Sequence, residues 1–120
     1  MKIHGVKGAI TADYNSVESI MNASEELLRM LIDRNKIAQE DVAAVFFTTS
    51  PDLNAEFPAR SAREIFGWNN VPLMCSHEMS KEGALEKCIR ILILWNTEIK
   101  QNKISHAYLK KASILRPDIS

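Results

Sequence analysis

The sequence carries no net charge, because its 15 Lys and Arg residues are matched by 15 Asp and Glu residues. With neither sign in excess, no overall field favours nucleic acid or an anionic membrane as a partner. The chain also lacks an apolar run approaching about twenty residues, and its first residues contain no apolar signal core. The sequence therefore predicts a cytoplasmic protein that has neither a nucleic-acid nor a membrane partner.

Residues that bind metals or act as nucleophiles are few and scattered. The cysteines, Cys75 and Cys88, fit no metal-binding spacing, and two thiols in a cytosolic chain are expected to stay reduced. His4, His77 and His106 are too widely separated to form a recognisable metal motif. Phosphate-binding or dinucleotide-binding glycine loops and nucleophile elbows are also missing. We therefore expect neither a metal nor a cofactor.

What remains is the composition of an ordinary globular protein of 120 residues, 46% hydrophobic and 25% charged. A chain of this length can bury roughly two-thirds of its unfolded surface around one core. Repeats, low-complexity segments and linkers rich in Pro, Gly or Ser are absent. We expect a single domain over residues 1–120.

The hydrophobic pattern alternates between strand-like and helix-like segments. Asn15, with Glu18 three residues later, is typical of a helix start, and apolar residues at helical spacing continue to about Arg34. Pro58 and Gly67 are placed to start and stop a short second helix. The predicted strands cover residues 3–10, 42–49, 71–76 and 85–95, and one long or two short strands follow over 104–115.

Together these elements predict an α+β fold with a mixed β-sheet of about five strands, one long helix and one short helix. Pro72 lies inside the third predicted strand and, since proline cannot donate to a ladder, indicates an edge strand or a bulge. One long helix cannot cover both faces of such a sheet, although several strands are apolar throughout. The uncovered face therefore predicts a homo-oligomer in which sheets pack together, with sites at subunit interfaces.

The most informative segment is 88–95, an Ile- and Leu-rich stretch that includes Arg90. Its length and composition predict a strand buried on both faces. A guanidinium there keeps its charge and needs an anionic partner, because burying an unpaired ion costs several kcal/mol or more. That partner is either a carboxylate of the protein, such as Glu78 or Glu64, or a group of an anionic ligand.

Other groups suited to binding an anion are distributed along the chain. With Arg90 they make five cations and two hydrogen-bonding groups: Arg90, Arg116, Arg63, Arg60, Lys7, Glu78 and Tyr108. Such a set can hold a small polyanion without attacking it. Taken singly, each member also has an ordinary interpretation as a packing residue, a structural ion pair or a solvated charge.

Short segments along nearly the whole chain match one known family, in order and with their spacing preserved. They are Gly5 to Ala9, Thr49-x-Pro51-Asp52-Leu53, Phe57-Pro58-Ala59-Arg60, Arg63-Glu64, Gly67-Trp68, Val71-Pro72, Cys75-x-x-Glu78-Met79, Lys87-Cys88-Ile89-Arg90, His106-x-Tyr108-Leu109 and Leu115-Arg116-Pro117-Asp118. Any one of these matches alone would be weak, but together they are a strong signal. On these residues the chain resembles the trimeric α+β class of chorismate mutase, which is distinct from the all-helical class.

The resemblance implies that the protein converts chorismate to prephenate by a Claisen rearrangement, a step in phenylalanine and tyrosine biosynthesis. It also implies a homotrimer whose packed sheets form a pseudo-barrel core, with active sites at the three subunit interfaces. The implied catalytic residues are Arg90 and Glu78. The implied substrate-binding residues are Lys7, Phe57, Arg60, Arg63, Met74, Cys75, Tyr108, Leu115 and Arg116.

The same resemblance gives these residues roles around the reacting bonds. Arg90 would donate to the ether oxygen that breaks and to a substrate carboxylate. Glu78 and Cys75 would meet the ring hydroxyl, while Tyr108 and Lys7 would hold the carboxylate of the pyruvyl group.

The remaining residues would form the walls of the site. Phe57, with Arg60 and Arg63 nearby, would come from the neighbouring subunit. Arg116 would attract or close over the dianion, and Leu115 would pack on it.

The reaction suits this set of residues. A unimolecular rearrangement needs a compactly held substrate and positive charge beside the ether oxygen, but no nucleophile, proton transfer or metal. Two positions depart from the family pattern. Lys7 stands where the family usually has arginine, so the forked grip on a carboxylate is lost, and Arg60 stands where lysine is common.

Two other classes of function remain open. A non-catalytic trimer that binds a small carboxylate would keep Arg90 as an anion anchor without converting chorismate. An imine-hydrolysing deaminase on a similar trimeric fold would need a group that activates water, for which Glu78 is the candidate.

Overall fold

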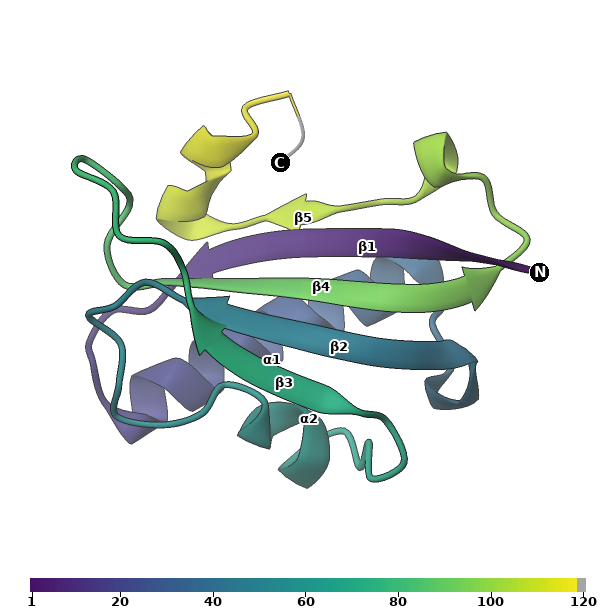
Figure 1. Cartoon of the computed structure of the whole chain (residues 1–120), viewed down its shortest axis with the longest axis horizontal. Helices are drawn as coiled ribbons and strands as arrows, with labels where there is room; N and C mark the ends of the chain where they lie inside the picture. The colour runs from purple at the N-terminus through teal and green to yellow at the C-terminus, as the bar shows by residue number, and fades with distance from the viewer. Residues whose placement is uncertain (119–120) are drawn as a thin grey trace.

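The computed structural model describes residues 1–118, which form one five-stranded sheet and its helices (Figure 1). The strands are β1 (Lys2–Thr11), β2 (Val42–Thr49), β3 (Leu73–His77), β4 (Cys88–Thr97) and β5 (Ala107–Tyr108). The helices are α1 (Val17–Asn35) and α2 (Arg60–Glu64), with 3-10 turns η1 (Gln39–Asp41), η2 (Gln101–Lys103) and η3 (Lys110–Leu115). Neither α1 nor α2 has the length and apolarity to cross a membrane.

The sheet is mixed, with the spatial order β3-β2-β4-β1-β5. The central strand β4 runs antiparallel to both β1 and β2, while the outer strands β3 and β5 run parallel to β2 and β1. The predicted α+β class is therefore confirmed. Pro72 directly precedes edge strand β3, and its carbonyl accepts the Val45 N–H at 2.9 Å, so the prediction of an edge strand at this proline is also confirmed.

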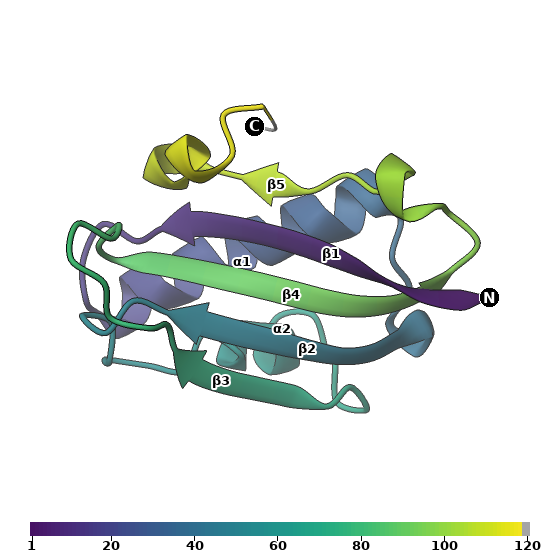
Figure 2. The same ribbon diagram turned by 45° about the horizontal axis from the view of Figure 1, so that its top comes forward.

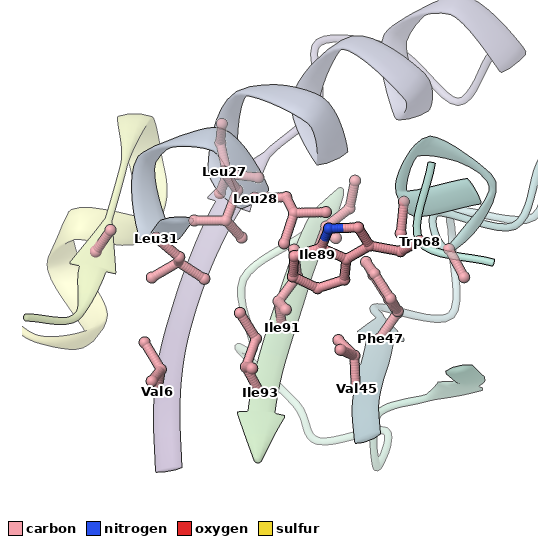
Figure 3. Close-up of a cluster of buried hydrophobic side chains, with 14 of the residues drawn as sticks. Val6, Leu27, Leu28, Leu31, Val45, Phe47, Trp68, Ile89, Ile91 and Ile93 are labelled. Carbon is pink, nitrogen blue, oxygen red and sulfur yellow. The ribbon is translucent and has the colours of Figure 1, made fainter. Parts of the chain in front are cut away.

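Helices α1 and α2 lie on the same face of the sheet (Figure 2). The apolar residues of α1 pack on the central strands, and Trp68, which follows α2 in the chain, packs into the same core (Figure 3). The labelled members of this core are Val6, Leu27, Leu28, Leu31, Val45, Phe47, Trp68, Ile89, Ile91 and Ile93. Gly8 permits this packing, because a Cβ there would lie 2.5 Å from the Ala107 carbonyl oxygen and 2.9 Å from Leu27.

Neither α1 nor α2 covers the opposite face of the sheet (Figures 1 and 2). Along β4, Ile89, Ile91 and Ile93 are buried against the helices, whereas Leu92 and Leu94 on the other side are only partly buried. The prediction that this strand is buried on both faces therefore does not hold for the single chain. The face carrying Leu92 and Leu94 is hereafter called the open face.

Three local predictions are corrected by the structure. The N-cap of α1 is Ser16, one residue later than predicted, and its hydroxyl accepts the Ser19 N–H at 3.1 Å. Strand β4 begins at Cys88, since Lys87 has a positive φ of 50°. The long strand or pair of strands predicted over 104–115 is wrong, because within this segment only Ala107 and Tyr108, the two residues of β5, pair with a neighbouring strand. Lys110, at φ 54°, then turns the chain into η3.

Candidate active site

Arg90 lies near the start of β4 and projects from the open face of the sheet. Its Cα is paired with Ala9 of β1 and Thr48 of β2, so strands flank it on both sides. The side chain is only 28% exposed, and its Nε is buried with no hydrogen-bond partner among residues 1–118. A buried guanidinium N–H without a partner leaves part of the donor capacity of Arg90 free for a ligand.

The nearest carboxylate to Arg90 belongs to Glu78, just beyond β3. Glu78 Oε2 lies 3.9 Å from Arg90 Nε, which is an ion pair without a hydrogen bond. The same oxygen accepts the Thr48 hydroxyl at 2.5 Å, and the Glu78 N–H donates to the Thr49 carbonyl at 2.8 Å. Glu78 is thus held beside Arg90 by β2 rather than by Arg90 itself.

Two adjoining depressions of about 570 and 620 Å³ open around Arg90. They share the loop segment 83–86, which connects β3 to β4. The larger depression is lined by Glu78 and Cys88, and the smaller by Lys111 and Leu115. Of the predicted site residues, Arg90 therefore lines both depressions, with Glu78 in one and Leu115 in the other.

The loop that enters β4 is held by Asp52. Its carboxylate accepts the Lys87 N–H at 2.9 and 3.2 Å and the Ser50 hydroxyl at 2.5 Å. Burial pushes the pKa of Asp52 up, but these hydrogen bonds, with Ser50 first, outweigh it and leave the pKa below its ordinary value. The Ser50 hydroxyl in turn accepts the Cys88 N–H at 2.9 Å, which fixes the strand two residues before Arg90.

Tyr108 and Arg116 lie near the edge of the sheet formed by β5, on the same face as Arg90. Tyr108 of β5 is buried in a small cluster with its β1 partner Ala9 and with Cys88 of β4. Arg116 adjoins Tyr108 and forms a two-pronged contact with Asp118, at 2.9 and 3.1 Å. Arg116 is thus already paired with a carboxylate that a ligand would have to displace.

Lys7 is exposed on the open face, two residues along β1 from the position that pairs with Arg90. Its Cα partner is Leu92, whereas the Cα partner of Arg90 is Ala9. Since residues two apart on a strand share a face, the ammonium of Lys7 and the guanidinium of Arg90 extend from the same side of the sheet. A dianion lying on this face would meet both charges.

The other predicted site residues form a second group at the β3 edge. Phe57 is 66% exposed and lines a cavity of about 390 Å³ with Cys75 and His77. Cys75 faces the helix side of the sheet, and burial raises the pKa of its thiol, while the charge of Arg63 opposes that rise. None of the residues lining this cavity lines either depression around Arg90.

The remaining members of the second group are cationic or apolar and largely exposed. Arg60 is bound on both sides by its own helix region, to Glu56 at 2.6 Å and to Glu64. Arg63 is exposed and makes no ion pair within residues 1–118. Met74 is 63% exposed on the open face. The single chain therefore does not bring Phe57, Arg63 and Met74 to Arg90.

Two residues that position the site, Thr48 and Ser50, carry no functional signal in the sequence alone. Thr48 holds Glu78, and Ser50 connects Asp52 to Cys88. The alternation of Phe46 and Thr48 along the predicted strand 42–49 indicates that they share a face, but only the pairing of Thr48 with Arg90 shows that this is the face of Arg90.

Comparison with known proteins decides the family. Residues 3–119 match the family model described as chorismate mutase type I. The chain belongs to this family. Over 120 residues it is 41% identical to the chorismate mutase AroH of Bacillus subtilis, covering all of this chain and 94% of that protein. It is 42% identical over 118 residues to AroH of Thermus thermophilus, covering 98% and 96% of the two chains.

The fold agrees with this assignment. A solved chorismate mutase from Clostridium thermocellum superposes with a TM-score of 0.89 at 35% identity, covering 92% of this chain and 97% of that one. The predicted family, the α+β fold of the single chain and the predicted function are confirmed. The chain is a chorismate mutase, an isomerase of aromatic amino acid biosynthesis whose substrate is chorismate and whose product is prephenate.

Proposed function

We propose that the two separated groups of residues are the halves of one chorismate-binding site, completed across a subunit interface of a homotrimer. One half contains Arg90 and Glu78, and the other contains Phe57 and Cys75. The observation that carries this proposal is the buried Nε of Arg90, which has no hydrogen-bond partner within residues 1–118. A second subunit would enclose a substrate against it and supply the missing wall.

The open face supports the association of subunits. Phe46, Met74 and Ile3 are 37%, 63% and 56% exposed on it, and Leu92 and Leu94 lie between them on the sheet. Apolar side chains spread over one uncovered face are typical of surfaces that pack against a partner. We propose that this face packs against copies of itself to form the pseudo-barrel core of the trimer.

In the proposed complex, electrostatic attraction selects the reactive conformer of the substrate. Arg90 donates to a carboxylate and to the ether oxygen, which becomes more negative as the bond to the ring breaks. A donor preorganised at a developing negative charge contributes about 2.7–4 kcal/mol to the lowering of such a barrier. Holding the two ends of the molecule together supplies the entropic part of catalysis.

Around this centre the other residues fix orientation. Glu78 accepts from the ring hydroxyl, and Cys75 of the neighbouring subunit approaches the same group. Lys7 and Tyr108 bind the carboxylate of the pyruvyl group. This arrangement requires no group to change protonation during the reaction.

The outer residues complete the enclosure. Arg116, with Leu115 beside it, covers the bound dianion after giving up its contact with Asp118. Phe57 and Met74 form the apolar wall from the neighbouring subunit, where Arg63 and Arg60 add positive charge at the rim.

We further propose that the chain is a single domain over residues 1–120 and that it works in the cytoplasm without a nucleic-acid or membrane partner. The balanced charge of the sequence supports the absence of a nucleic-acid partner and of an anionic membrane surface as a partner. Two free cysteines, Cys75 and Cys88, suit a reducing compartment.

Subunit mixing tests the shared site. Arg63→Ala and Arg90→Ala chains, each nearly inactive alone, are combined under conditions of subunit exchange. If the two residues belong to different halves of one site, some interfaces regain two intact halves and activity rises above either parent. An increase is not expected when Arg90→Ala is mixed with Glu78→Gln, because both changes lie in the same half. A fully active monomer in sedimentation would contradict the proposal.

A further inference from the structure

The outer edge of β1 is closed largely by side chains rather than by a neighbouring strand. The backbone of β5 pairs only with Gly8 and Ala9. Nearer the start of β1, the side-chain amide of Gln101 accepts the Gly5 N–H at 2.9 Å and donates to the Gly5 carbonyl at 2.7 Å. Between these two points, the Lys7 N–H donates to Nδ1 of His106 at 3.1 Å. The imidazole thus takes the place of a strand carbonyl beside Lys7.

This bond fixes the protonation state of the imidazole. An N–H donor requires a lone pair on Nδ1, so His106 must be neutral with its proton on Nε2. A proton on Nδ1 would set two donors against each other and leave the Lys7 N–H without its acceptor. The backbone of Lys7 is therefore held by neutral His106 and released by its protonated form.

The charged groups around His106 are mostly cationic. Arg34 of α1 donates to the His106 carbonyl at 2.8 Å, Arg116 approaches from the segment after η3, and Lys7 faces the ring from β1. Asp118 is the nearby carboxylate, and it is paired with Arg116. Burial of the ring, followed by the charges of Arg116 and Lys7, lowers the pKa of His106 below its ordinary value. At neutral pH the ring is thus an acceptor.

We propose that His106 is a positioning residue for chorismate binding, which holds the backbone of Lys7 so that its ammonium meets the pyruvyl carboxylate of the substrate. This inference rests on the proposed role of Lys7 as a carboxylate ligand. Lysine is a flexible point charge, so its direction depends strongly on how its backbone is held. Since that carboxylate is bound in both the ground and transition states, loss of the bond raises KM more than it lowers kcat.

Two variants of His106 distinguish the effect of losing the hydrogen-bond acceptor from the effect of losing only the titration of the ring. His106→Asn offers an amide oxygen near the position of Nδ1 and does not titrate, whereas His106→Leu removes the acceptor. At neutral pH we expect His106→Leu to raise KM roughly three- to tenfold, the effect of one ordinary hydrogen bond, and His106→Asn to restore most of the loss. In the wild type, KM should rise as the pH falls through the lowered pKa of His106, and this rise should be absent in His106→Asn.

Lys7→Ala is measured in the same series to distinguish the two proposals. If Lys7→Ala leaves KM unchanged, Lys7 is not a ligand and the proposed site is wrong at this position. If Lys7→Ala raises KM but His106→Leu does not, only the positioning role of His106 is overturned.

NMR of the wild-type protein gives a direct readout that does not depend on whether His106→Leu folds. The 15N chemical shifts of His106 should show a neutral ring with its proton on Nε2, and the Lys7 amide shift should move as the ring titrates. An Nδ1-protonated ring at neutral pH, or a Lys7 amide insensitive to that titration, would overturn the inference.

Discussion

The carboxylate of Glu78 lies 3.9 Å from Nε of Arg90 and is bonded instead to the hydroxyl of Thr48. The ion pair is close enough to orient the guanidinium but leaves its Nε–H free. A tighter pair would consume the donor that the proposed contact with the ether oxygen requires. Thr48 therefore keeps the two groups adjacent without letting them neutralise each other's hydrogen-bonding capacity.

Thr48→Val is predicted to lower kcat/KM about tenfold. The substitution preserves shape but removes the hydroxyl, which frees Glu78 to rotate toward Arg90 and compete with the substrate. Hydrogen bonds to charged groups contribute about 1.5–3 kcal/mol, and partial exposure of Glu78 reduces the effect here. Steady-state kinetics measure it, and Thr48→Ser, which keeps the hydroxyl, is the matched control. Equal activity of the valine and serine variants would remove Thr48 from the account.

Lys7→Arg is predicted to raise kcat/KM modestly, and Lys7→Ala to lower it chiefly through KM. Arginine can offer a second parallel hydrogen bond to a carboxylate, for which about 1.5–3 kcal/mol is the limit when alignment is good. Repacking at the exposed edge of β1 reduces that gain. Initial rates over a range of chorismate concentrations separate kcat from KM. A lack of response to both substitutions would show that Lys7 does not touch the substrate.

Asp52→Asn is predicted to destabilise the fold by about 1 kcal/mol at neutral pH, because it removes the charge that accepts from Ser50 and Lys87. The pKa of Asp52 is lowered in the folded state. The contribution of Asp52 to the free energy of unfolding is therefore complete above the ordinary carboxyl pKa of about 3.9. It is lost as the pH falls through the lowered pKa of the folded state.

Urea unfolding of wild type and Asp52→Asn at neutral and acid pH checks this linkage. The difference in free energy of unfolding should shrink at the acid end. A difference that stays constant with pH would mean that the charge of Asp52 contributes nothing.

The fold could largely be predicted from sequence because the strands and α1 have distinct apolar periods. Pro72 correctly indicated an edge strand. The last strands could not be predicted, since the segment 104–115 is apolar enough for a strand but turns at Lys110, where its partner β1 ends. The shift of the N-cap from Asn15 to Ser16 is local: Asn15 Oδ1 instead accepts the backbone N–H groups of Asn54 and Ala55 at 3.0 Å.

The site was harder to predict than the fold. The sequence alone singles out Arg90 as a candidate, because a charge that interrupts an apolar strand can be recognised without knowledge of the tertiary structure. Thr48 and His106 could be found only from the pairing of β2 with β4 and of β1 with β5. Cys75 and Glu78 are three residues apart in sequence yet line different cavities, because strand alternation sends Cys75 to the helix side.

The central claim is that the guanidinium of Arg90 stabilises the transition state of the rearrangement. Arg90→Lys keeps the charge but cannot donate to a carboxylate and the ether oxygen at once. Loss of one preorganised donor corresponds to about 2.7–4 kcal/mol, or roughly a hundred- to thousandfold in rate.

The decisive measurement is therefore kcat of Arg90→Lys for the conversion of chorismate to prephenate, with folding checked by circular dichroism and assembly by sedimentation. We predict that kcat falls by this factor while KM changes far less. An unchanged kcat in a folded variant with native assembly would show that Arg90 is a structural residue, and would contradict the account.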